Sequence, residues 1–206
     1  MAALRVGGKL MTTLTATAAR SSFRFALDID GWSELSAWGY DEGLESYFAQ
    51  LWRDGDPVNS NPTVWLMGYD PRYTRREDLF AAILATTHAA PLNILRALGG
   101  DREQPPAIRP GAAPILAHRH AIARHDTDSF YLRGAAEALA WLAAEAPHGP
   151  LTGQKSPPRG PGFLEVEAER WAASAAAHQR RDLPRDWFAG IETTLRWANG
   201  QAASPW

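Results

Sequence analysis

The chain has 206 residues, of which 45% are hydrophobic and 21% are charged, and its net charge at pH 7 is −2. These values are typical of a folded protein that buries one full core, and they exclude a disordered or fibrous protein. The chain has no cysteine, which excludes disulfides, a thiolate nucleophile, sulfur-bound zinc and iron–sulfur clusters.

Residues 1–22 are expected to form a flexible N-terminal tail. The charged residues within 1–24 are all basic, and threonines interrupt the apolar stretch that a signal peptide would need. No later apolar run approaches the roughly 18 residues that can cross a bilayer. We therefore expect a cytoplasmic protein that does not bind a membrane.

The next part of the chain predicts two strands separated by a helix. Apolar residues alternate over 23–29, which predicts a strand that ends in a turn at Asp30-Gly31. Spacings of three and four between apolar residues predict an amphipathic helix over 41–52. A β-branched and aromatic run over 63–67 predicts the most buried strand of the sheet.

Helical patterns dominate the middle of the chain. A capping box at Thr74 predicts a helix over 74–84, and a proline at its start with a glycine after its end predicts a second helix over 91–98. An alanine-rich stretch predicts a third helix over 128–146. The Pro/Gly-rich stretch 99–114 is expected to be a loop.

The last third predicts a helical hairpin. Five prolines make 147–162 a linker, and two amphipathic helices over 163–201 are joined at Leu183-Pro184. We expect the pair to dock on the rest of the chain. The fold class is therefore α/β or α+β, with a small sheet, packed helices and a helical C-terminal hairpin. The expected divisions are a tail (1–22), an α/β core domain (23–146), a linker (147–162) and the hairpin (163–206).

Asp28 and Asp30 are candidate metal ligands. They lie one residue apart near the end of a predicted strand, so both side chains point to the same side. Such oxygen pairs hold Mg²⁺ or Mn²⁺ in phosphoryl-transfer enzymes, and Asp70, after the second predicted strand, could supply a third ligand. The same letters also describe a strand followed by a tight turn, which needs no metal, and we favour that interpretation.

The run from Leu27 to Ser36 resembles the opening motif of class III nucleotide cyclases. In that family Asp-Ile-x-Gly-Phe-Ser/Thr precedes a helix, and its first Asp, here Asp28, binds metal. The distance along the chain to Gly68-Tyr69-Asp70 is also close to the family's spacing to a second Gly-Asp. Tyr69 interrupts that second motif, and the later substrate-reading segments of the family have no counterpart here.

A His-x-His pair, His118 and His120, is a further metal candidate, because two such residues on a strand share one face. Arg119 and Arg124 place positive charge beside them, which opposes cation binding. We favour a partly exposed helix start or loop with charged histidines.

An acidic block and an excess of tryptophan suggest a protein-binding surface. Residues 25–60 hold one basic and eight acidic residues, and the chain has nine tryptophans. Most tryptophans fall on predicted apolar stripes, whereas Trp32, Trp38 and the terminal Trp206 are expected to be surface anchors. The expected partner-binding residues are Trp32, Trp38, Asp41, Glu42 and Glu45.

No complete catalytic constellation is apparent, so the leading hypothesis is a non-catalytic interaction or regulatory protein without a cofactor. We expect the partner to be another protein, one with a basic surface in the first place. Self-association of this chain is the other possibility. The first alternative is a Mg²⁺- or Mn²⁺-dependent phosphoryl- or nucleotidyl-transfer enzyme that uses Asp28, Asp30 and Asp70. The second is a DNA-associated regulator, but charges are nearly balanced in the C-terminal helices, so nucleic acid is not the expected partner.

Overall fold

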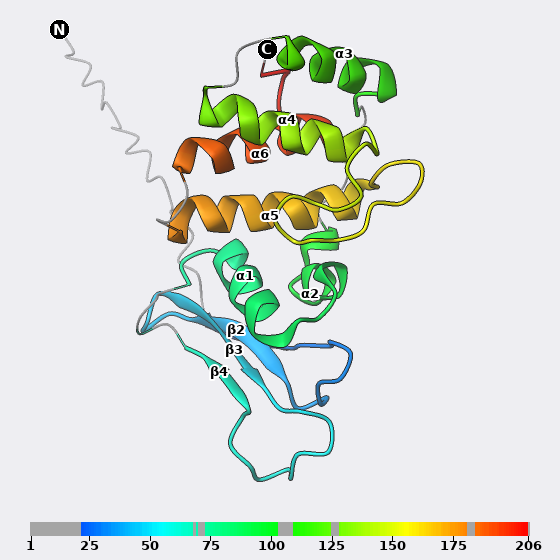
Figure 1. Cartoon of the computed structure of the whole chain (residues 1–206). Coiled ribbons are helices and arrows are strands. Elements are labelled where there is room, and N and C mark those ends of the chain that lie inside the picture. Colours follow the sequence, from blue (N-terminus) through cyan, green and yellow to red (C-terminus); the bar gives the residue numbers. More distant parts are fainter. Residues whose placement is uncertain are drawn as a thin grey trace, which may run out of the picture.

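The structure is a computed structural model, and it describes residues 22–67, 69, 73–102, 109–124, 128–180 and 184–205. Within these residues a four-stranded antiparallel sheet comes first and helices follow, which is an α+β fold. Figure 1 shows a layered arrangement, with the sheet at one end, α1 and α2 against it, α5 across the middle, and α3, α4 and α6 at the other end.

The sheet is a simple meander. It is formed by β1 (Phe23–Ala26), β2 (Ala37–Asp41), β3 (Ser46–Leu51) and β4 (Val64–Leu66), in the order β1-β2-β3-β4. Side chains of Leu27 and Ile29 stay buried beyond β1 while Asp28 and Asp30 are exposed, so the predicted alternation is confirmed. The predicted turn is confirmed too, because Trp32 N–H donates to the Ile29 carbonyl at 3.0 Å and Gly31 has a φ of 80°.

The helix predicted over 41–52 is wrong, because this segment is the β2–β3 hairpin. Its apolar residues fit both the helical period of about 3.6 residues and the strand period of two, and pairing with β2 selects the strand. Tyr47, Ala49 and Leu51 then share the face that packs into the core.

The strand predicted over 63–67 is confirmed as β4, but it is not the most buried strand. β4 is an edge of the sheet, and the Trp65 side chain is 55% exposed. Trp65 pairs with Gln50, on the face opposite the core-facing residues, so the indole gains no cover from the helices.

The predicted helices are largely confirmed. They are α1 (Arg76–Thr87), α2 (Pro91–Ala97), α4 (Phe130–Leu142), α5 (Phe163–Gln179) and α6 (Arg185–Ala198). Thr74 does not cap α1, whose N-cap position is Arg75 and carries no side-chain cap.

Two helical elements were not predicted, a 3₁₀ turn η1 (Gly100–Arg102) and α3 (Ala112–Ala123). The stretch 99–114 was expected to be a loop because of its prolines. Pro114 lies in the first turn of α3, where a proline is tolerated because the backbone N–H there has no partner inside the helix.

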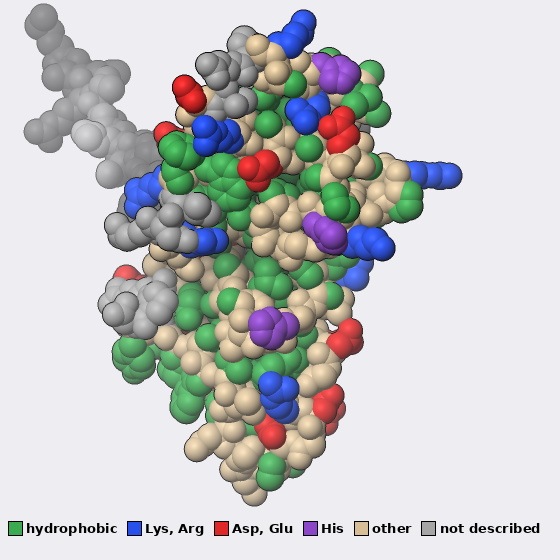
Figure 2. All heavy atoms as spheres, viewed as in Figure 1, with side chains coloured by type: hydrophobic (Ala, Val, Ile, Leu, Met, Phe, Trp, Pro, Cys, Tyr) green, Lys and Arg blue, Asp and Glu red, His purple; other side chains and the backbone are tan. Residues whose placement is uncertain are grey.

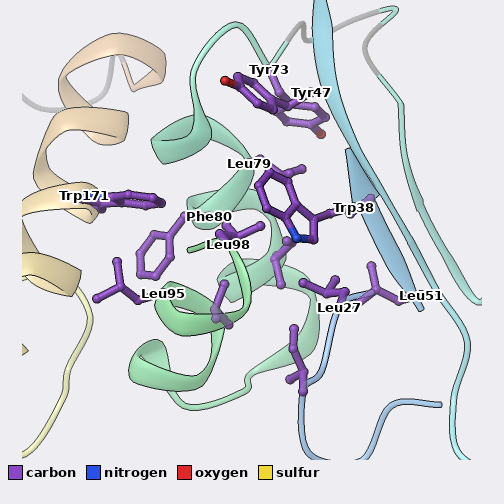
Figure 3. Packing of buried hydrophobic residues seen from close by; sticks show 14 of the residues in the cluster. Leu27, Trp38, Tyr47, Leu51, Tyr73, Leu79, Phe80, Leu95, Leu98 and Trp171 are labelled. Carbon is purple, nitrogen blue, oxygen red and sulfur yellow. The ribbon is translucent and has the colours of Figure 1, made fainter. Parts of the chain in front are cut away.

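Helix α5 joins two hydrophobic clusters. Ala168, Trp171 and Ala172 belong to the cluster that includes the sheet, α1 and α2, whereas Val166 and Ala173 belong to the cluster with α4 and α6. Figure 3 shows Trp171 beside Phe80, and their ring centroids are 5.8 Å apart in an edge-on contact. Helices α5 and α6 pack on each other as predicted, and α5 also docks on the sheet-bearing part of the chain.

Residues 143–162 contain no helix or strand, as the prolines of 147–162 predict. The buried carboxylate of Glu169 holds this segment against α5, because it accepts hydrogen bonds from Leu151 N–H and from Thr152 N–H and Oγ1–H. None of the helices in the described part of the chain is both long and apolar enough to cross a bilayer.

Candidate functional site

The β2–β3 turn brings the three acidic residues of the predicted partner-binding surface together. Asp41 ends β2 and its Oδ1 accepts the Leu44 N–H at 3.0 Å, which fixes the turn. Glu42 and Glu45 are exposed beside it. The structure therefore places Asp41, Glu42 and Glu45 on one tight, acidic turn at the end of the sheet.

Two of the three tryptophans expected at the surface are buried, and the third, Trp206, lies outside the described residues. Trp32 is 9% exposed, with the Arg53 guanidinium 5.1 Å from its ring centroid, and Trp38 is 5% exposed. The prediction that Trp32 and Trp38 are surface anchors is wrong, since both side chains belong to the core cluster. The tryptophan that the sheet does expose is Trp65, which the sequence pattern assigned to a buried strand.

Exposed apolar side chains are concentrated in the sheet half of the molecule, here defined as residues 22–69 as far as they are described. The exposed large hydrophobic residues of this half are Phe25, Leu35, Val58, Trp65 and Tyr69, against Leu116 and Phe130 in the helices. Figure 2 shows hydrophobic side chains along one edge of this half. The sheet half also contains the acidic block.

Asp28 and Asp30 line one hollow of about 370 Å³, together with Asn93, Arg96 and Ala97 of α2. Asn93 Nδ2 donates to Asp30 Oδ2 at 2.8 Å. Asp70, the third proposed ligand, lies outside the described residues. Among those that are described, no group of three or more His, Asp or Glu side chains is arranged to hold a metal ion.

The segment after Gly31 does not form the helix that the cyclase-like motif implies. Trp32 makes a bridge to Arg53, and the chain then enters β2. The expected helix is absent because residues 37–41 complete the sheet between β1 and β3.

The His-x-His pair lies on α3, where residues two apart point to different sides, so it does not share one face. His118 packs edge-on against Trp197, with ring centroids 4.9 Å apart, and its Nε2 lies 3.2 Å from Ser204 Oγ. This histidine therefore helps to pack α3 against the C-terminal end of α6.

Sequence reasoning missed a cleft between the sheet and the helices. It has a volume of about 690 Å³ and is called the aromatic cleft below. Its lining residues are Phe23, Phe25, Ala26, Trp38 and Tyr47 from the sheet, with Arg76, Ala97, Leu98, Gly99 and Arg102 opposite. Alternation along β1 could have placed Phe23 and Phe25 on one face, but no local signal brings the arginines there.

Comparison with known protein families, curated proteins and solved structures finds no match.

The pKa values of two buried carboxylates on α5 are shifted in opposite directions. Burial raises the pKa of Glu169, and its hydrogen bonds with Thr152 and Leu151 only partly oppose this. Burial would likewise raise the pKa of Glu167, but the hydrogen bond and charge of Arg170, with the amides of Asn199 and Gln201, outweigh it and lower that pKa. Both groups lie between packed elements, where they hold segments together.

Proposed function

We propose that this chain is a cytoplasmic, non-catalytic interaction protein that binds a basic protein through its sheet half. One observation carries this proposal: most of the large hydrophobic side chains that the described residues expose lie in the same half as the acidic block. Exposed aromatic residues supply most of the binding energy in many interfaces, and surrounding charges select the partner and accelerate its association.

Trp65 is the central anchor of the proposed surface. Its side chain is 55% exposed on edge strand β4, and Tyr69, 75% exposed, follows a few residues later. An indole exposed on an edge strand leaves a large apolar area in contact with water. A partner that covers the ring would bury this area and gain the corresponding free energy. Trp65 therefore replaces Trp32 and Trp38 as the exposed tryptophan of the sheet half.

Charge favours a different protein over a second copy of this chain. Residues 25–60 carry a net charge of −7 from Arg53 and eight acids, so two copies facing each other through this half would repel. A basic surface would be attracted, and the attraction would weaken at high salt.

The test compares two variants of this surface with matched changes in the helical half. A partner is recovered from host lysate on the immobilised protein, purified, and titrated against Trp65→Ala and against the double variant E42K/E45K. The first should weaken binding by about thirtyfold, because truncating an interface tryptophan costs about 2 kcal/mol. The second should mainly slow association and reduce its salt dependence.

The controls make equivalent changes elsewhere. Phe130→Ala removes a side chain that is 45% exposed on α4, and D128K/E137K reverses two exposed charges. Both control proteins should bind as the wild type does. A partner that binds Trp65→Ala and E42K/E45K as tightly as wild type, or no salt-sensitive partner at all, would contradict the proposal.

The metal-dependent phosphoryl-transfer enzyme is the second candidate, favoured by the fact that Asp28 and Asp30 line one hollow. Arg96 lines the same hollow and repels cations. We therefore expect Mn²⁺ to leave the tryptophan fluorescence of wild type unchanged. A saturable response that Asp28→Asn abolishes would favour the enzyme instead.

A further inference from the structure

The aromatic cleft has the opposite charge from the rest of the sheet half. Two arginines line it, Arg76 from α1 and Arg102 from η1, and the cleft has no acidic residue among its described lining. Its volume of about 690 Å³ is within the range of small-molecule sites, which is about 300 to 1,000 Å³. A basic partner that fits the acidic surface would not fit this cleft.

The two guanidinium groups converge on one point. A Cβ atom placed on Gly99 would lie 3.9 Å from Arg102 Nε and 4.0 Å from Arg76 Nη1. The Arg76 group is held in position, because its Nη1 donates to the Leu98 carbonyl at 3.4 Å and its plane lies over the Trp171 ring, 5.3 Å from the centroid. A carboxylate placed between the two guanidinium groups would accept a charge-assisted hydrogen bond from each.

The sheet side of the cleft is aromatic. The rings of Phe23 and Phe25 lie 5.6 and 5.7 Å from that of Trp38, and Figure 3 shows Trp38 and Tyr47 projecting from the sheet toward the helices. Phe25 is 52% exposed, although Trp38, its cross-strand partner, is buried. A planar ring inserted beside Phe25 would remove this apolar area from water.

An unused hydrogen-bond donor lies in the same wall. Trp38 is 5% exposed, and its indole Nε1–H is buried without a hydrogen-bond partner in the part of the chain that the structure describes. Buried donors are nearly always satisfied, so this one is an exception. Because the nitrogen is itself buried, its N–H reports on the cleft wall and is not a contact offered to a ligand.

From these observations we propose that the aromatic cleft binds a small aromatic carboxylate. The ring packs against Phe25 and Trp38, and the carboxylate accepts hydrogen bonds from Arg76 and Arg102. The neighbouring hollow shares Ala97 with the cleft and contains Asp28 and Asp30, which repel anions. The site therefore selects a compact ligand with one anionic group over a longer dianion.

The proposal is independent of the protein partner, and its test uses two naphthalene probes of similar shape. ¹⁵N-labelled protein is titrated with 1-naphthoate and with the neutral 1-naphthalenemethanol, following the Trp38 indole cross-peak, which is assigned by its loss in Trp38→Phe. Naphthoate should shift this peak saturably. The alcohol should bind about tenfold more weakly or not at all, because it lacks the charge-assisted hydrogen bonds.

The matched variants are Arg102→Ala and Arg96→Ala. Arg102 is exposed and Arg96 lines only the neighbouring hollow, so neither change removes a core side chain, and unperturbed spectra confirm that both variants fold. Arg102→Ala should weaken naphthoate binding about tenfold, and Arg96→Ala should change it less than twofold. The proposal is overturned by no saturable shift up to about 5 mM naphthoate, by equal affinity for acid and alcohol, or by an Arg102→Ala protein that binds as wild type does.

Discussion

The stability of the fold should depend strongly on the carboxylate of Glu167, which is fully buried on α5. Two Arg170 nitrogens and the Trp171 indole donate to its Oε1, while Asn199 Nδ2 and Gln201 Nε2 donate to its Oε2 at 3.0 and 3.1 Å. Glutamine has nearly the same shape, so Glu167→Gln removes charge without creating a cavity. It also turns an NH₂ group toward donors that require an acceptor.

The expected loss of stability follows from these contacts. Arg170 is only 11% exposed, so the substitution leaves most of its guanidinium buried beside a neutral group. Removing one partner of a buried ion pair typically costs about 3 to 5 kcal/mol. The expected decrease is about 3 kcal/mol, which for a chain of this size corresponds to a melting temperature lower by roughly 6 to 12 °C.

The loss should depend on pH. Because the pKa of Glu167 is lowered in the folded protein, its contribution is present above the pKa of the unfolded chain and is lost as the pH falls through the folded value. The difference between wild type and Glu167→Gln should therefore be largest near neutral pH. It should shrink as the pH falls below 4.5, the ordinary value for glutamate.

Guanidinium-induced unfolding at neutral and acidic pH measures both effects, provided that the slope m is unchanged. The control is Glu137→Gln, the same chemical change at an exposed position that contacts only the Trp187 indole among the hydrogen bonds found for it. It should change stability by less than about 0.5 kcal/mol. A Glu167→Gln protein as stable as wild type at neutral pH, or a loss independent of pH, would refute the reasoning.

Two further predictions concern close packing and a second buried carboxylate. A methyl group on Gly190 of α6 would lie 2.1 Å from the Tyr131 carbonyl oxygen of α4. Gly190→Ala should therefore lower the free energy of unfolding by about 2 kcal/mol or more, although alanine favours helices. An unchanged melting temperature would exclude this close crossing of α4 and α6. Because burial raises the pKa of Glu169, its contribution to stability is present below the unfolded pKa and is lost as the pH rises through the folded value. Glu169→Gln should therefore gain stability relative to wild type as the pH is raised above 4.5, and denaturant titrations that show the opposite trend would contradict this.

Several elements could be predicted from sequence because their signals are local. Proline at the first position of α2 and the alternation from Leu27 to Asp30 each depend on neighbouring residues alone, and the structure confirms them. The helix prediction for 41–52 is wrong because the apolar residues of this segment fit both a helical and a strand period. Only the pairing of β3 with its neighbours β2 and β4 selects the strand.

The sequence by itself determined that the chain buries an apolar interior, that its acidic residues are concentrated near the start, and that helices fill its C-terminal third. Tertiary structure alone decided which aromatic side chains are exposed, because strand position and not residue type leaves Trp65 in water and buries Trp32 and Trp38. It also brought Arg76 and Arg102 to the aromatic rings of β1 and β2. Those groups are far apart along the chain, and only the packing of α1 and α2 on the sheet places them in one cleft.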